Sequence, residues 1–276
     1  MVRAGFPGRM GPPITGGAGS APAADVDAQA WISAGANADA TRATNVFKAL
    51  KAIAGPTSNI FADIKAAGGT IQLYRGLTAG GASIPDLTLN RVASPVNSPS
   101  FNTATGYTLN GTSQYLDSGH TIIQAANYFA IIFCNHISFT NNDGLVSDAD
   151  AITPALDIIQ RTGNIFRTTV TKVGGTTGLR DSAAAYSTGI DYQHGFRIAS
   201  QSGQPYSNVV SAQAFTTDGT ALSIAADMRA ADGTLKLGRS GVNYANIQVH
   251  GFVAAPLTLT ATQLQNLVDA MEVFWS

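Results

Sequence analysis

The carboxylates are the first side chains to consider, because two of them, acting as acid and as nucleophile or base, can cleave a glycosidic bond. The chain has a single glutamate, Glu272, in a predicted terminal helix beside Phe274 and Trp275, and we expect it to lie away from any sheet face. The pair Asp148-x-Asp150 falls in a predicted loop, where solvated carboxylates are favoured over weak calcium ligands. We therefore expect no glycan hydrolysis and no enzymatic activity.

The four histidines could bind a metal or act as general bases, but they are scattered along the chain and none has the paired spacing of a zinc site. They are His120, His136, His194 and His250. No Gly-x-Ser-x-Gly elbow exists to present a nucleophilic serine, although a serine, a histidine and an aspartate could still meet in space. The Gly-rich piece 174–178 lacks the lysine and helix of a phosphate-binding loop. We therefore expect no metal and no cofactor.

Tyrosines in or near predicted loops could stack on sugar rings if amide side chains nearby bind the sugar hydroxyls. Four tyrosines have this placement: Tyr186, Tyr192, Tyr206 and Tyr244. The candidate ligand-binding residues are Tyr206, Asn208, Asn243, Tyr244 and Asn246. Packing in the core or between subunits is the favoured use of each tyrosine, because a chain with few charges has much uncharged polar surface that suits contact with other subunits.

Residues 1–24 are rich in Gly and Pro, so neither a helix nor a sheet ladder can propagate through them. One interpretation is a solvated tail. The other is a partner-anchoring arm that becomes ordered along a neighbouring subunit. Its anchors would be Arg3, Phe6, Arg9, Met10 and Ile14. The arm has no apolar core of the signal-peptide type, which predicts a protein made and kept in the cytoplasm.

Composition excludes several classes of partner. The 16 Lys and Arg residues nearly balance the 17 Asp and Glu residues, and only 12% of the chain is charged, so we expect no nucleic-acid binding. No stretch approaches the roughly 18 apolar residues that a membrane span needs, so we expect no membrane insertion. Cys134 lies in the apolar run 128–134, which predicts a buried and unreactive thiol.

Three short helices are predicted at the start of a segment that covers residues 25–97. Asp25 and Asp27 can cap the first helix, Asp39 or Thr41 the second, and Thr57 or Ser58 the third. After a strand at 70–74, the chain alternates apolar pieces with Gly, Pro and Ser, which is typical of a connection that runs over a surface. The apolar side chains of the helices are expected to form a small core of their own or a docking face.

Strands dominate from residue 98 to the final helix, which Thr260 can cap. Tyr107 and Leu109 alternate with polar neighbours, and Asn110-Gly111 followed by Tyr115 predicts a hairpin. Without helices between the strands, antiparallel sheets packed face to face are expected. Further strands are predicted at 128–134, 144–147, 155–160, 165–173, 192–199, 209–215, 234–237 and 247–254.

Two separated pieces resemble concanavalin A-like, or laminin G-type, jelly-roll sandwiches. Residues 108–117, TLNGTSQYLD, resemble the early strand pair of that family, and 232–239, 249–253 and 257–260 resemble its last strands and terminal helix. The resemblance covers about 98–276. It implies a mainly β fold, an antiparallel jelly-roll sandwich with a small N-terminal helical prefix and a C-terminal helix.

The start of the helical prefix, DVDAQAWI at 25–32, combined with such a sandwich resembles structural proteins of tailed bacteriophages and prophages. This resemblance implies a non-enzymatic virion protein, a capsid decoration or a tail or fibre component assembled in the host cytoplasm. Its partners would be capsid or tail subunits and other copies of itself. The alternative is a carbohydrate-binding module of a receptor-binding fibre that recognises host surface glycans.

Overall fold

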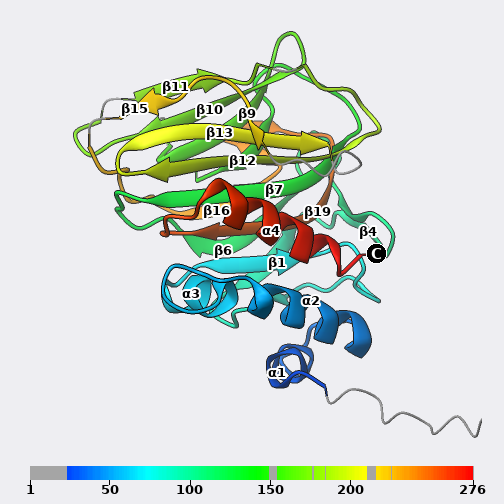
Figure 1. The fold of residues 1–276 in the computed structure, drawn as a ribbon. Helices are drawn as coiled ribbons and strands as arrows, with labels where there is room; N and C mark the ends of the chain where they lie inside the picture. Colours follow the sequence, from blue (N-terminus) through cyan, green and yellow to red (C-terminus); the bar gives the residue numbers. More distant parts are fainter. Residues whose placement is uncertain are drawn as a thin grey trace, which may run out of the picture.

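The computed structural model describes residues 24–148, 154–175, 177–183, 185–209, 216–224 and 226–275. Two sheets pack face to face, three helices lie at the N-terminal side, and one helix near the C-terminus covers a sheet (Figure 1). The fold is therefore the mainly antiparallel β-sandwich that the strand pattern predicts, with helices at both ends of the chain. In the part of the chain described, no helix is long and apolar enough to span a membrane.

The first sheet has nine strands and contains the long strands β7, β12 and β19 at its centre. Its main path runs β14 (Thr216–Thr217), β13 (Ser202–Val209), β12 (Asp191–Ala199), β7 (Tyr128–His136), β19 (Ile247–Ala255), β5 (Gly106–Thr108) and β4 (Ser100–Asn102). Off this path, β1 (Thr70–Leu73) pairs with β19, and β15 (Leu222–Ser223) pairs with β13.

The second sheet has ten strands. Its main path runs β11 (Thr177–Asp181), β10 (Ile165–Thr171), β9 (Leu156–Arg161), β8 (Gly144–Ser147), β16 (Thr234–Leu237), β6 (Tyr115–Thr121), β3 (Val92–Val96) and β2 (Ile84–Pro85). A short hairpin, β17 (Arg239–Ser240) and β18 (Asn243–Tyr244), joins this sheet through β8.

The helices begin at the caps that local chemistry dictates, with one exception. They are α1 (Val26–Ser33), α2 (Ala40–Ala52), α3 (Ile60–Ala66) and α4 (Ala261–Glu272). Asp25, Asp39 and Thr260 cap α1, α2 and α4 as predicted. The prediction that Thr57 or Ser58 caps α3 is wrong, because the cap is Asn59, whose Oδ1 accepts from Ala62 N at 2.9 Å. The backbone N–H groups of Thr57 and Ser58 instead donate to the Asp63 carboxylate.

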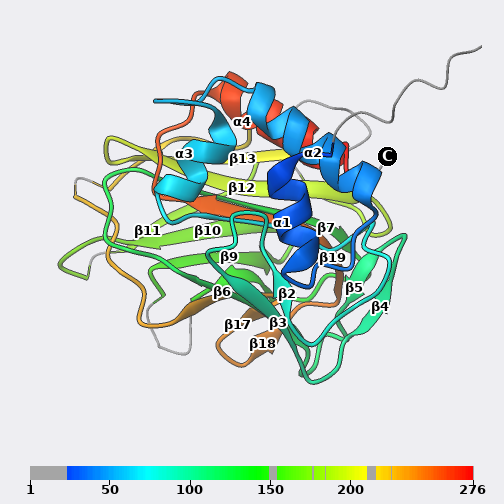
Figure 2. The same cartoon turned by 90° about the horizontal axis from the view of Figure 1, so that it is seen from below.

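The helical segment shares one apolar core with the sandwich. Figure 2 shows α2 lying alongside α4. The Trp31 indole donates to Pro85 O at 2.7 Å, and its ring lies 5.7 Å from that of Phe274 after α4. β1 pairs with β19, and β3 pairs with β6. Both sheets therefore begin upstream of residue 98, where the sequence places the start of the sandwich.

The stretch around Asn110-Gly111 is not the hairpin that the sequence predicts. β5 pairs with β4 and β19 in the nine-stranded sheet, whereas β6 pairs with β3 and β16 in the ten-stranded sheet. Asn110 Oδ1 accepts from the backbone N–H groups of Thr112, Ser113 and Gln114. This local turn carries the chain from one sheet to the other.

Candidate functional site

The structure separates the residues that the sequence groups as a ligand site. Tyr206 and Asn208 lie in β13 of the nine-stranded sheet, so the prediction of a loop there is wrong. Tyr206 is buried, and the Arg197 guanidinium carbon lies 5.2 Å from its ring centroid. Tyr186 and Tyr192, also expected near loops, are buried in the core. The anchors Arg3, Phe6, Arg9, Met10 and Ile14 lie outside the described residues.

The remaining candidates, Asn243, Tyr244 and Asn246, lie at the rim of the ten-stranded sheet. Together with Tyr115 and Arg239, which the sequence did not single out, they form what we call the Tyr244 patch. The rings of Tyr115 and Tyr244 lie 6.4 Å apart, and the Arg239 guanidinium carbon lies 5.0 Å from the first centroid and 5.7 Å from the second. All three side chains are partly exposed, and Asn243 is exposed. The patch thus combines aromatic faces, a cation and amides at the surface.

A tight hairpin holds this patch in place. Gly241 has φ +58° at the first centre of the turn between Ser240 and Asn243, the position that favours glycine in a type II′ hairpin. Tyr244 pairs with Gly144 of β8, where a side chain would clash, because a Cβ on Gly144 would lie 2.1 Å from Ser240 N. The backbone therefore fixes the hairpin, and with it the patch, against the sheet.

A surface groove of about 400 Å³ lies at the start of the sandwich and contains one partly exposed aromatic ring, Phe101. The Tyr107 ring lies 5.1 Å from that of Phe101, and its hydroxyl donates to Gly81 O and accepts from Gly81 N. We call it the Phe101 groove; its lining residues are Gly80, Gly81, Ala82, Pro95, Ser98, Pro99, Phe101 and Tyr107.

Loop hydrogen bonds connect the groove to the Tyr244 patch. Gln114, next to Tyr115 of the patch, donates to the carbonyls of Asn97 and Ser98 at 3.1 and 3.0 Å. Asn97 and Ser98 have φ of +59° and +54°, left-handed conformations that are strained for residues other than glycine. Strain of this kind collects at ligand-binding loops. Through Gln114, the loop at the edge of the Phe101 groove is thus hydrogen-bonded to the residue that precedes Tyr115 of the patch.

The carboxylates do not lie where the sequence places them. Glu272 faces the sheet, because Gln193 of β12 donates a short hydrogen bond to Glu272 Oε1, and burial raises the Glu272 pKa to about 7. Asp191 accepts from Arg75 at 2.7 Å and from Asn135 at 2.8 Å. Both carboxylates thus have structural partners, and neither lines the Phe101 groove.

Asp148 is buried and not solvated, which corrects the loop prediction. Its carboxylate accepts from Ala155 N at 3.1 Å and Leu156 N at 3.2 Å, so it stabilises the backbone conformation at the start of β9. Asp150 lies outside the described residues. Because these backbone N–H groups satisfy the Asp148 carboxylate, we assign this side chain a structural role.

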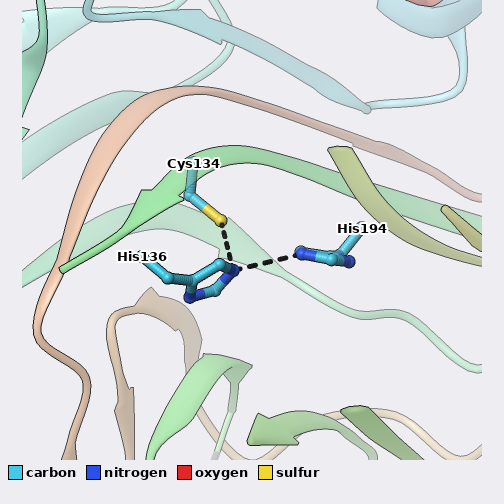
Figure 3. Close-up of side chains that lie close together, drawn as sticks. All are labelled: Cys134, His136 and His194. Atoms are coloured by element: carbon cyan, nitrogen blue, oxygen red, sulfur yellow. Dashed lines mark hydrogen bonds between the residues drawn. The ribbon is translucent and has the colours of Figure 1, made fainter. Parts of the chain in front are cut away.

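The histidines are not all scattered, because two of them meet Cys134 between the sheets (Figure 3). His136 Nε2 lies 3.2 Å from His194 Nε2 and 3.6 Å from Cys134 Sγ. Cys134 and His136 are two residues apart on β7, and Tyr192 pairs with Cys134, so His194 of β12 lies on the same face. The 58 residues between His136 and His194 leave no spacing pattern in the sequence, and the strand predicted at 128–134 ends before His136, so this cluster was missed. The Cys134-x-His136 spacing, which places both side chains on one face of a strand, is the signal that could have identified two of its members.

Burial keeps this cluster uncharged. It lowers the pKa of His136 to about 3, lowers that of His194 well below its usual value, and raises that of the Cys134 thiol. The Gln160 amide donates to His136 Nδ1 at 2.8 Å, which assigns the ring proton of His136 to Nε2. That proton can then be donated to His194 Nε2.

Structure comparison shows the fold of the chain. The Trypanosoma rangeli sialidase has a TM-score of 0.56 and 11% identity over 85% of this chain and 38% of the sialidase chain. A botulinum neurotoxin serotype D binding domain has a TM-score of 0.54 and 11% identity over 77% of this chain and 52% of that domain. The chain therefore spans less than two-fifths of the sialidase. No protein-family model matches it, and no curated protein is significantly similar to it in sequence.

Proposed function

We propose that this chain is a non-enzymatic carbohydrate-binding β-sandwich module, and that the glycan lies across the Tyr244 patch and the Phe101 groove. The observation that carries the proposal is the arrangement of the patch. Two partly exposed tyrosine rings flank a guanidinium group, and the exposed Asn243 amide lies in the same hairpin. Apolar sugar faces pack on aromatic rings, while amides and guanidinium groups bind hydroxyl and carboxylate oxygens.

The combined extent of the patch and the groove favours an oligosaccharide over a single sugar. One ring would pack on Tyr244 and Tyr115, and the next units would pass Gln114 toward Phe101 in the groove. Arg239 adds positive charge at one end, which favours glycans that carry a carboxylate there. The fold is compatible with this proposal, because β-sandwich rims commonly carry binding loops.

Binding of immobilised glycans, including acidic oligosaccharides, tests the proposal. Tyr244→Ala should weaken binding of the best glycan at least about tenfold, or 1.4 kcal/mol, because the stacking face is lost. Phe101→Ala should weaken long glycans more than short ones. Val242→Ala is the matched control, because this side chain is 86% exposed at the tip of the same hairpin.

Two results would overturn the proposal. One is a wild-type protein that binds no glycan at millimolar concentration. The other is a Tyr244→Ala variant that binds as well as Val242→Ala but loses its oligomers, which would assign the patch to subunit packing. The bound glycans should be recovered uncut, because the residues that define the Tyr244 patch and the Phe101 groove include no carboxylate that could act as acid or nucleophile.

The setting that the sequence resemblance implies is a separate prediction. A phage virion protein, assembled in the host cytoplasm with capsid or tail subunits, could carry such a module on a receptor-binding fibre. The low charge of the chain and the resemblance at residues 25–32 support it. Detection of this chain in purified particles is the measurement that checks it.

A further inference from the structure

The cluster of Cys134, His136 and His194 is a polar group in the middle of an apolar core. The three residues are 0%, 0% and 3% exposed, and the ring of Phe166 from the opposite sheet lies 3.9 Å from that of His194. Burying imidazole groups costs free energy unless their nitrogen atoms are satisfied. Apolar residues of similar volume would pack there without that cost, so the grouping calls for a physical reason.

The geometry of the cluster is that of ligands around one ion. The two Nε2 atoms lie 3.2 Å apart, Cys134 Sγ lies 3.6 Å from His136 Nε2, and all three atoms lie within 4.8 Å of one another. For separations of 3.2, 3.6 and up to 4.8 Å, the point equidistant from the three atoms lies at most about 2.4 Å from each, a few tenths of an ångström longer than metal–imidazole bonds and close to metal–thiolate bonds. Small side-chain adjustments suffice to place an ion there.

We propose that Cys134, His136 and His194 form a buried binding site for monovalent copper. One thiolate and two imidazoles are the ligands that copper and zinc prefer, and magnesium and calcium do not. Monovalent copper with one thiolate and two neutral imidazoles carries no net charge, whereas divalent zinc would leave one positive charge in the core. Isolated charge is costly at such a depth, so the ligand set favours the monovalent ion.

The carboxylates near the cluster do not supply the missing negative charge. Asp191 lies on the outer face of the sheet, because its partner Asn135 alternates with Cys134 and His136 along β7. Asp218 accepts hydrogen bonds from Tyr186 and Ser207, and the Tyr186 ring lies between it and His194. Among the described residues, the three-member group therefore contains no carboxylate ligand.

Gln160 would orient one ligand. Its amide nitrogen lies 2.8 Å from His136 Nδ1, and the amide oxygen accepts from Thr140 N at 3.3 Å. When an ion occupies Nε2, the ring proton of His136 moves to Nδ1, and the Gln160 amide turns so that its oxygen accepts that proton. Copper binding also releases the thiol proton of Cys134 to solvent.

Anaerobic titration of metal-free protein with monovalent copper, in competition with a chromophoric chelator, tests the site. We expect uptake of one equivalent and a rise in the melting temperature, because the ion binds the folded state only. Cys134→Ser and His194→Gln should each lower copper affinity at least about 100-fold. His120→Gln, which changes a buried histidine of β6 in the other sheet, is the control and should bind copper as the wild type does.

Three results would overturn the proposal. They are no stoichiometric uptake by the wild type, uptake that survives Cys134→Ser, and binding of divalent zinc in preference to monovalent copper. If the variants fail to fold, X-ray absorption of the copper-loaded wild type decides the question. One sulfur at about 2.2 Å and two nitrogens at about 2.0 Å are expected, and an ion without a sulfur ligand contradicts the site.

Discussion

Asp157 is a buried carboxyl group beneath the hairpin that carries the Tyr244 patch. It accepts a hydrogen bond from Ser240 Oγ at 3.1 Å, and burial raises its pKa to about 7. An aspartate in the unfolded chain has a pKa of about 3.9. The folded state therefore keeps a proton that the unfolded state loses between about pH 4 and 7, so the free energy of unfolding falls as pH rises through that window.

Asp157→Asn removes this titration. The variant should be more stable than the wild type at pH 8 by about 2–4 kcal/mol and nearly equal to it at pH 4. Urea unfolding of both proteins from pH 4 to 8 measures the difference, from which the other titrating groups cancel. Asp232→Asn, which removes a carboxylate whose side chain is 68% exposed at the surface, is the control for the loss of a negative charge. A difference between Asp157→Asn and the wild type that stays constant across the range would contradict the assignment.

At the scale of elements, α4 and the residues after it pack between the N-terminal helices and the sandwich. Its buried face is formed by Leu264, Leu267, Val268 and Met271, and the chain after it places Phe274 against Trp31 of α1. Gly76 allows the close approach, because a Cβ there would lie 3.1 Å from the Phe274 ring. Trp275 then packs on Phe133 of β7 with ring centroids 5.4 Å apart.

Phe274→Ala should lower the free energy of unfolding by about 3–5 kcal/mol, because Phe274 is fully buried and its removal leaves a cavity between α1 and the sandwich. Phe274→Leu fills most of that volume and should cost less. Denaturant unfolding followed by far-ultraviolet circular dichroism measures both. Equal stabilities of the alanine and leucine variants would contradict the cavity explanation, because leucine restores most of the lost volume.

Local chemistry explains why some elements could be predicted from sequence and others could not. Asp25, Asp39 and Thr260 were identifiable because a cap depends on residues two or three positions away. The hairpin predicted at Asn110-Gly111 was wrong because this dipeptide favours a turn but does not determine the sheet in which the following strand pairs. β13 was missed because Gly203 and Pro205 are unfavourable in strands, yet it pairs along β12 over eight residues.

The candidate site was less predictable than the fold because most of its contacts depend on which strands pair. Asn243 and Tyr244 were identifiable from composition, but Tyr115 and Arg239 join them only through pairing of β17 with β18 and the position of β6. The approach of His194 to Cys134 depends on the register of β12 against β7. Contacts of this kind are set by strand pairing between distant segments, which residue spacing does not report.

At the scale of the whole molecule, the sequence divides the chain at residue 98, whereas the core is continuous across that position. β1 pairs along one edge of β19, and its Ile71 and Leu73 are fully buried or nearly so. β3 pairs with β6 at the other sheet. A fragment of residues 98–276 would expose the backbone groups of β19 and β6 that these strands pair with, together with the apolar surface under α1 and α2.

We therefore expect residues 98–276 alone to fail to fold, although they contain most of the strands. Residues 24–276 should fold with the unfolding free energy of the full chain, because the Gly- and Pro-rich arm is expected to add no packing to an isolated subunit. Expression of the two truncations, with urea unfolding and near-ultraviolet circular dichroism, makes the comparison. A cooperative unfolding transition in the 98–276 fragment would establish an independent sandwich domain, and the helices and β1 would then be a dispensable attachment to it. Loss of stability in the 24–276 chain would instead show that the arm packs on its own subunit.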